Sequence, residues 1–135
     1  MMKGIVIDLN KEVKENGSFR KVVYTTKKSQ LVLMSIAKGE EIGEEVHDLD
    51  QFIKVEEGDA EISIEEETFF AGRGFAAIIP VGVKHNVKNR GEKDLKIYTL
   101  YCPPEHRDGA HHQTREEAIE DETHFNGETT GNKAL

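Results

Sequence analysis

Short apolar segments alternate with turn residues along most of the chain, and helical periodicity is scarce. Segments rich in β-branched and large apolar residues, which suit half-buried strands, lie at residues 5–7, 19–25, 31–36, 75–79 and 95–101. Ile53 and Val55 alternate with Lys54, which is the period of two expected for a strand with one buried face. A hairpin turn signal at Glu57-Gly58-Asp59 leads into a further strand at residues 60–64. This even spacing predicts an all-β protein, built as an antiparallel jelly-roll barrel.

The pattern changes after Pro103-Pro104, where apolar residues become few. Thr114 is followed three residues later by Glu117, a capping box that predicts a short helix over residues 115–122. Residues 127–135 have the composition of a frayed or disordered end. We therefore expect a β-barrel domain over residues 1–102 and a C-terminal tail over residues 103–135.

Charge and cysteine content narrow the classes of partner. The formal net charge of −8 argues against a nucleic-acid partner and against docking on an anionic membrane, because both need a surplus of Lys and Arg. No apolar run approaches the roughly 18 residues that span a bilayer, and the first residues lack the apolar stretch of a signal peptide. Cys102 is the single cysteine, which suits a reducing compartment. We expect a cytoplasmic protein.

Candidate metal ligands lie in two segments of the strand-rich body. A strand projects residues i and i+2 to the same side, so Glu45 and His47 should face together. Gln51 starts the next inward-facing series, and His85 shares a face with Val87. If the two segments are neighbours in the barrel, carboxylate, imidazole and amide groups converge there.

The spacing of these residues resembles the two sequence motifs of the cupin family. The first motif has two histidines and a glutamate between glycines; here Gly39 and Gly58 stand at the ends and His47 takes the second histidine position. Glu45 stands at the first histidine position and Gln51 at the glutamate position. The second motif is matched at every position by Gly74, Pro80, Gly82, His85 and Asn89.

The resemblance implies a double-stranded β-helix barrel and one divalent ion, of the kind of Zn, Mn, Fe or Ni, held by Glu45, His47, Gln51 and His85. The family's usual ligand set is three histidines and one glutamate, so an amide oxygen here takes the place of an imidazole. Glu45, His47 and His85 also have the two-His, one-carboxylate composition of non-haem Fe(II) oxygenases. Phosphomannose isomerases, another branch of the family, bind zinc with a similar set in which Gln and Glu are exchanged.

Each candidate also has a simpler interpretation. His85 could be a core histidine, Glu45 could belong to a solvated acidic loop, and Gln51 could orient a water or a substrate. The tail histidines His106, His111 and His112 fit a solvated segment; a lid over the barrel mouth that contributes His106 or His112 is the alternative.

Three functions remain open for such a chain. Isomerase-like chemistry on a small polar molecule, sugar-like or a carboxylic acid, is slightly favoured, with Glu45 as ligand or base. A sugar phosphate would need a cation at the mouth, for which Arg20 and Arg73 are the candidates, since Lys54 and Lys84 should point outward. The alternatives are a non-haem Fe(II) dioxygenase and a non-catalytic ligand-binding module. Analogy with the family also predicts a homodimer.

Overall fold

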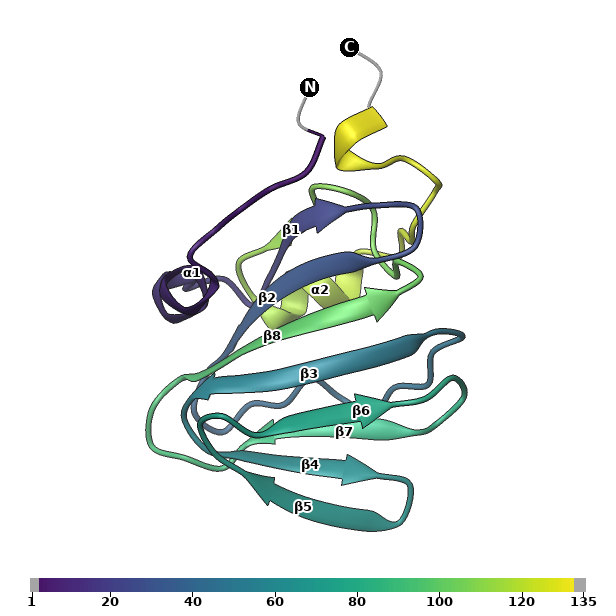
Figure 1. The fold of residues 1–135 in the computed structure, drawn as a ribbon. Coiled ribbons are helices and arrows are strands. Elements are labelled where there is room, and N and C mark those ends of the chain that lie inside the picture. The colour runs from purple at the N-terminus through teal and green to yellow at the C-terminus, as the bar shows by residue number, and fades with distance from the viewer. Residues whose placement is uncertain (1–2, 133–135) are drawn as a thin grey trace.

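The computed structural model describes residues 3–132, which form two antiparallel β-sheets (Figure 1). The large sheet has the strand order β6-β3-β8-β2-β1-β9. Its strands are β6 (Ala76–Ile79), β3 (Asp50–Glu57), β8 (Leu95–Cys102), β2 (Gln30–Ile36), β1 (Arg20–Thr25) and β9 (His111–His112). The small sheet has the order β5-β4-β7, with β5 (Glu67–Ala71), β4 (Ala60–Ile64) and β7 (His85–Asn89). The predicted all-β, double-stranded β-helix barrel is confirmed.

One hydrophobic core lies between the two sheets. Met34, Ile53 and Ile97 of the large sheet join Ile62 and Val87 of the small sheet in a single buried cluster. Gln51, Ile53 and Val55 all face inward as their alternation predicted. Two facing sheets with apolar inner sides exclude water from the space between them, which stabilises the barrel and defines its interior.

The segment before β3 runs beside β7 and brings the two motifs together. Backbone bridges pair Glu41 with Lys88 and Glu45 with His85. The Glu45 amide donates to the His85 carbonyl at 2.9 Å, and the His85 amide donates to the Glu45 carbonyl at 3.0 Å. Because β7 pairs with β4 on its other side, this register fixes where His85 enters the barrel.

Two motif residues have structural roles. Gly58 adopts a φ of +97°, and a Cβ there would lie 3.0 Å from the Asp94 carbonyl oxygen, so both the backbone conformation and the close approach need glycine. The Asn89 amide nitrogen donates to the carbonyl oxygens of Ile36 at 2.9 Å and Lys93 at 2.8 Å. Asn89 thereby connects the end of β7 to the large sheet and to the turn before β8.

The N-terminal prediction was wrong. Residues 5–7 form no strand; the first element is helix α1 (Leu9–Glu15). Asp8 caps it, since its carboxylate accepts a hydrogen bond from the Lys11 amide, and Val13 anchors it in the core. Val6 is fully exposed, so no neighbouring strand supplies the pairing that an isolated apolar triplet needs.

The C-terminal tail has more fixed structure than its composition indicated. Helix α2 (Arg115–Glu120) begins at the predicted Thr114 cap and ends two residues earlier than expected, where the Asp121 carboxylate accepts hydrogen bonds from Thr123 instead. Within the segment predicted to be frayed, Thr129 is buried, and a 3₁₀ turn η1 spans Thr130–Asn132. Residues 133–135 lie outside the described residues. The division into a barrel domain and a tail at residue 102 stays a prediction.

Contacts with β1 and β2 hold the tail against the barrel. The Gln30 side chain, 1% exposed, exchanges hydrogen bonds with the backbone of His106, donating to its carbonyl at 2.8 Å and accepting from its amide at 3.1 Å. The Val22 amide donates to the Ala110 carbonyl, and the Thr25 amide donates to the Thr130 hydroxyl. In Figure 1, α2 lies behind β2 and β8. Within residues 3–132, neither α-helix has the length or apolar character to cross a membrane.

Candidate metal centre

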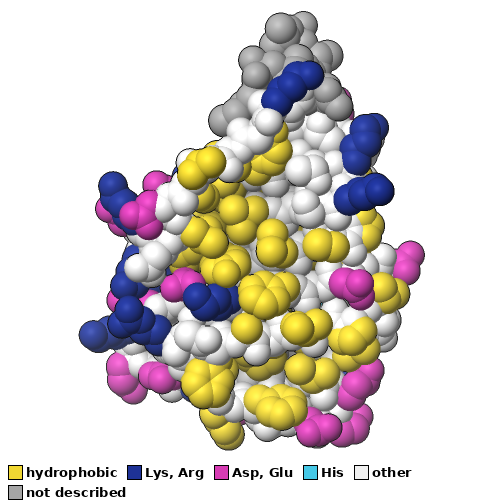
Figure 2. Space-filling model, in the orientation of Figure 1, with side chains coloured by type: hydrophobic (Ala, Val, Ile, Leu, Met, Phe, Trp, Pro, Cys, Tyr) yellow, Lys and Arg dark blue, Asp and Glu magenta, His cyan; other side chains and the backbone are white. Residues whose placement is uncertain are grey.

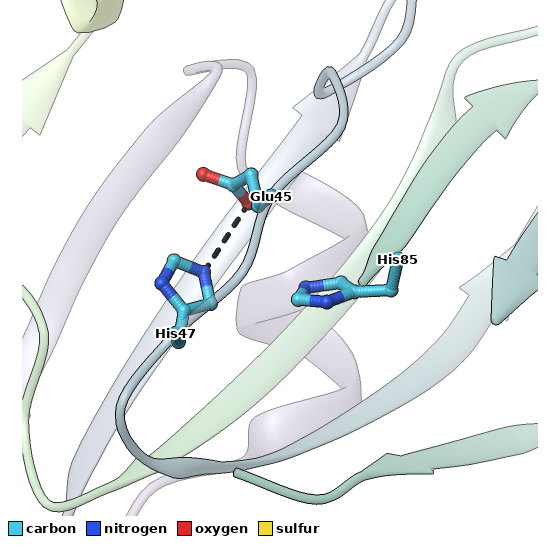
Figure 3. A group of neighbouring side chains, drawn as sticks. All are labelled: Glu45, His47 and His85. Carbon is cyan, nitrogen blue, oxygen red and sulfur yellow. Dashed lines mark ion pairs between the residues drawn. The ribbon is translucent and has the colours of Figure 1, made fainter. Parts of the chain in front are cut away.

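Glu45, His47 and His85 converge inside the barrel mouth. One potential ligand atom from each lies within 4.8 Å of those of the other two (Figure 3). Glu45 and His47 project from the same side of the segment that pairs with β7, and His85 is the first residue of β7. The predicted i, i+2 relation and the predicted neighbourhood of the two segments are both present.

The hydrogen bonds of His85 define which ring nitrogen is free. Its Nδ1 lies 3.0 Å from the Val83 carbonyl oxygen, which can only accept, so Nδ1 carries the proton. In the neutral ring Nε2 then holds a lone pair, and this atom is buried without a hydrogen-bond partner. A ring fixed by a backbone carbonyl, with its other nitrogen bare, is the usual arrangement of a metal-binding histidine.

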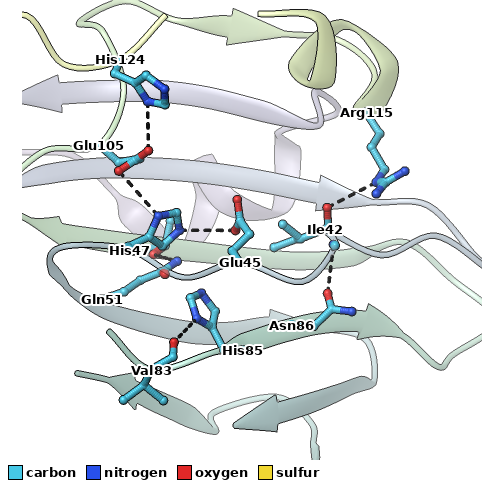
Figure 4. A network of polar contacts seen from close by, with 12 residues as sticks. Ile42, Glu45, His47, Gln51, Val83, His85, Asn86, Glu105, Arg115 and His124 are labelled. Atoms are coloured by element: carbon cyan, nitrogen blue, oxygen red, sulfur yellow. Dashed lines mark hydrogen bonds and ion pairs between the residues drawn. The ribbon is translucent and has the colours of Figure 1, made fainter. Parts of the chain in front are cut away.

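Gln51 contributes a second unsatisfied acceptor. Its amide nitrogen donates to the Thr99 hydroxyl at 3.0 Å, and its Oε1 is buried without a partner. β3 places it opposite Tyr101, whose ring meets the His47 ring edge-on at a centroid distance of 5.8 Å. Figure 4 shows the Gln51 amide near His47.

His47 lies between two carboxylates. Its Nε2 is 3.5 Å from Glu45 Oε1 and its Nδ1 is 3.6 Å from Glu105 Oε2, ion-pair distances without hydrogen-bond geometry (Figure 4). Burial alone would lower the pKa of His47, but Glu45 and then Glu105 raise it above its ordinary value. Burial alone would raise the pKa of Glu45, but His47, Arg20 and His85 hold it below its ordinary value. Without a metal ion, each of the two groups therefore favours the charged form of the other.

This donor set fits a divalent cation. His47 Nε2, His85 Nε2 and Gln51 Oε1 are buried acceptor or ligand atoms that no described donor satisfies. Leaving such atoms unpaired is costly in a barrel interior, and a cation held by Glu45, His47 and His85 would satisfy both Nε2 atoms. A cation would also replace the proton on His47.

The tail histidines differ from one another. His106 packs edge-on against Tyr101 at 5.2 Å, and burial together with the nearby Arg20 lowers its pKa to about 2, so it stays neutral. His112 is buried and its Nε2 lies 2.8 Å from Asp121 Oδ2. His111 turns the other way, with its Nε2 2.6 Å from the Ser18 hydroxyl. The sequence could not decide whether these side chains reach the metal site; none of them belongs to the cluster of Glu45, His47 and His85, but His106 and His112 line a cavity that Glu45 also lines.

A cavity of about 170 Å³ lies between the barrel mouth and the tail. Glu45 lines it, so the cluster and the cavity share a wall. Its other polar walls come from β1 and the tail: Arg20, Glu105, His106, Arg107, His112, Arg115, Asp121 and His124. Arg73, the other sequence candidate for an inward cation, lines a separate surface hollow near α1. No motif spacing points to Glu105, whose approach to His47 depends on how the chain turns after β8.

Comparisons with known proteins agree with this architecture. A protein of Bacillus halodurans, BH2720, has a crystal structure that superposes with a TM-score of 0.87 at 36% identity, covering 88% of this chain and 96% of that chain. The uncharacterized protein YrkC of Bacillus subtilis is 36% identical over 124 residues, which are 87% of this chain and 67% of YrkC. The structure of KdgF from Halomonas sp. has a TM-score of 0.60 at 27% identity, covering 66% of this chain and 82% of that chain. Residues 32–101 match the sequence model of the cupin domain, and the chain belongs to the cupin family.

Proposed function

We propose that Glu45, His47, His85 and Gln51 bind one divalent metal ion, of the kind of Zn, Mn, Fe or Ni, and that the protein acts on a small polar molecule beside it. The observation that supports this most is the group of buried, unpartnered ligand atoms on His47, His85 and Gln51. The three-residue cluster of Glu45, His47 and His85 supports it independently.

Isomerase-like chemistry is the reaction class we favour. A bound ion would act as a Lewis acid on a carbonyl or hydroxyl oxygen. Glu45 lines the cavity and its lowered pKa keeps it ionised at neutral pH; it either holds the ion as a ligand or leaves the ion and takes a proton from a molecule there. Burial raises the pKa of Tyr101, so its phenol stays protonated. The likeness to phosphomannose isomerases extends only to ligand composition.

The composition of the cluster favours one second candidate. Two histidines and one carboxylate are the set of non-haem Fe(II) oxygenases. Iron in the purified protein, with oxygen consumed in proportion to substrate, would support a dioxygenase. Turnover with zinc or manganese and no oxygen uptake would support the isomerase. Ligand binding without turnover would support a non-catalytic module.

Elemental analysis of protein expressed without metal supplements tests the proposal. We expect about one divalent ion per chain in the wild type and none in the His47→Ala/His85→Ala variant, since that change removes both imidazoles of the cluster. The matched control is His124→Ala, because His124 is exposed and its partner is Glu105. Equal metal content in the wild type and the double variant would refute the metal site.

We also propose that the protein is a homodimer whose second copy covers an apolar groove on β5 and β6. Phe69, Phe70, Phe75 and Ile78 are exposed there, and Figure 2 shows hydrophobic side chains gathered over the lower half of this face. Exposed apolar patches of this kind mark association sites. Light scattering should report a dimer for the wild type and a monomer for Ile78→Asp; a monomeric wild type would contradict the proposal.

A further inference from the structure

Arg20 is a buried cation that forms no direct ion pair with a described residue. It is the first residue of β1, it is 6% exposed, and its Nε is buried without a hydrogen-bond partner. Among residues 3–132 its guanidinium forms no ion pair; it lies over the Phe19 ring at 5.5 Å, and its charge helps to lower the pKa of Glu45. A buried, unpaired charge is strongly unfavourable, so an anion that reaches Arg20 would remove a large penalty.

The tail places a second unsatisfied group beside Arg20. β1 pairs with β9 so that Arg20 and His112 are directly opposite, and residues opposite one another in a ladder project to the same face. The Asp121 carboxylate can only accept, so His112 Nε2 carries the proton of their 2.8 Å contact. In the neutral ring Nδ1 then holds a lone pair, and Nδ1 is buried without a partner. This atom accepts a hydrogen bond, for which a hydroxyl group is a suitable donor.

The charges around the cavity indicate how many negative charges the ligand should carry. Three arginines and three acids line it, and each acid lies near a histidine: Glu45 by His47, Glu105 by His47 and His124, and Asp121 by His112. Of the lining arginines Arg20 is the buried one, and it forms no direct ion pair with a described residue. A single negative charge balances it, whereas a doubly charged phosphate would also meet the three carboxylates.

We propose that Arg20 binds the carboxylate of a small α-hydroxy acid while His112 Nδ1 accepts the hydrogen bond of its hydroxyl. The guanidinium fork matches a carboxylate in a bidentate arrangement. The cavity of about 170 Å³ is below the roughly 300 Å³ at which drug-sized ligand sites begin, so the acid has only a few carbon atoms. This inference rests on the proposed function only in that the far end of the acid faces Glu45 and the metal ion.

Binding of simple probes tests the assignment. The affinities of lactate, propionate, glycerol and inorganic phosphate are measured by calorimetry, for the protein as purified and after chelator treatment, with metal content recorded in parallel. Lactate should bind best. Propionate lacks the hydroxyl group, glycerol lacks the negative charge, and phosphate carries a second negative charge that the cavity does not balance. Arg20→Met should weaken lactate binding roughly 30-fold or more in both preparations and leave the metal content unchanged. Arg73→Met removes an exposed arginine outside the cavity and should change neither the lactate affinity nor the metal content.

Thermal unfolding separates a binding role of Arg20 from a structural one. Removing an unpaired buried cation should leave the midpoint of the ligand-free protein unchanged or raise it, while the shift produced by lactate disappears. If Arg20→Met fails to fold, Arg20→Lys keeps the charge without the fork and should weaken lactate binding roughly tenfold. Undiminished lactate binding in the Arg20 variant, or equal binding of lactate and propionate, would overturn the assignment. Absence of metal from the protein as purified, with lactate binding retained, would refute the metal site alone.

Discussion

The metal cluster, taken as an inner end, and the Arg20 side of the cavity, taken as an outer end, are unsatisfied in opposite ways; Glu45 belongs to the cluster and also lines the cavity. At the inner end, His47, His85 and Gln51 present acceptor atoms that no donor reaches. At the outer end, Arg20 presents its Nε, a buried donor that no described acceptor reaches. Since buried polar groups are normally paired, the inner end indicates a cation and the outer end an anion. A molecule in this small cavity can therefore be recognised twice, by the metal ion at one end and by Arg20 at the other.

The largest expected effect comes from removing one ligand at the inner end. His85→Ala should weaken divalent metal binding more than about 100-fold, because loss of a mere supporting contact already costs 10- to 100-fold. Lactate binding to chelator-treated protein should stay within a few-fold, since Arg20 lies at the other end. Metal titration and lactate calorimetry on the same variant measure both. A parallel loss of both affinities would show that the two ends do not act separately.

Gln51→Glu tests whether residue 51 contacts the metal ion at the inner end. The change restores the carboxylate that the family's first motif has at this position and adds a negative charge beside the cluster, so we expect divalent metal binding to tighten about tenfold. Two neighbouring carboxylates repel each other without the ion, so the chelator-treated variant should unfold at lower urea than the wild type. Gln51→Leu is the matched control and should weaken metal binding. Equal affinities in the two variants would show that residue 51 does not contact the ion.

Breaking the attachment of the tail should affect only the outer end. Gln30→Met removes the side-chain hydrogen bonds to the His106 backbone and should cost about 1 kcal/mol in the free energy of unfolding. Lactate binding should weaken severalfold with unchanged metal content. Urea unfolding, together with hydrogen exchange over residues 105–112, measures the change. Gln113→Met, at an exposed tail position, should have little effect; an equal loss in both variants would contradict a specific role for Gln30.

The two ends also differ in how far the sequence predicts them. Strand alternation gave the inward direction of Gln51, and the i, i+2 spacing gave the shared face of Glu45 and His47, because both follow from the local geometry of a strand. The resemblance to the cupin motifs supplied the remaining step, the neighbourhood of His85. Apolar composition alone wrongly predicted a strand at residues 5–7; the first element is a helix that begins after the Asp8 cap.

Neither strand alternation nor the motif resemblance predicts which residues form the outer end. Arg20 and Arg73 were equal candidates for an inward cation, and what separates them is the pairing of β1 with β9, a strand of two residues. The tail is positioned by single side-chain contacts to backbone, such as those of Gln30 and Thr130, which leave no periodic pattern. Contacts of that kind depend on the finished fold, so local propensity does not reveal them.

The smallest expected effect concerns pH and the contact that orients His112. Hydrogen bonds from Thr123 and then His112 hold the pKa of Asp121 well below its usual range. A carboxyl whose pKa is lower in the folded protein stabilises it above the unfolded pKa, near 3.8, and this stability is lost as the pH falls below that value. Since Asp121 is partly exposed, we expect at most about 1 kcal/mol.

Asp121→Asn should therefore be less stable than the wild type at pH 7, and the difference in urea midpoint should shrink steadily as the pH falls below 3.8 toward the pKa of the folded protein. Glu122→Gln alters the adjacent exposed carboxyl and should show no such convergence. The variant should also lose part of its preference for lactate over propionate at pH 7, because an amide no longer fixes the proton on His112 Nε2. If that preference survives intact, His112 does not receive the hydroxyl, and the outer end reduces to the charge of Arg20.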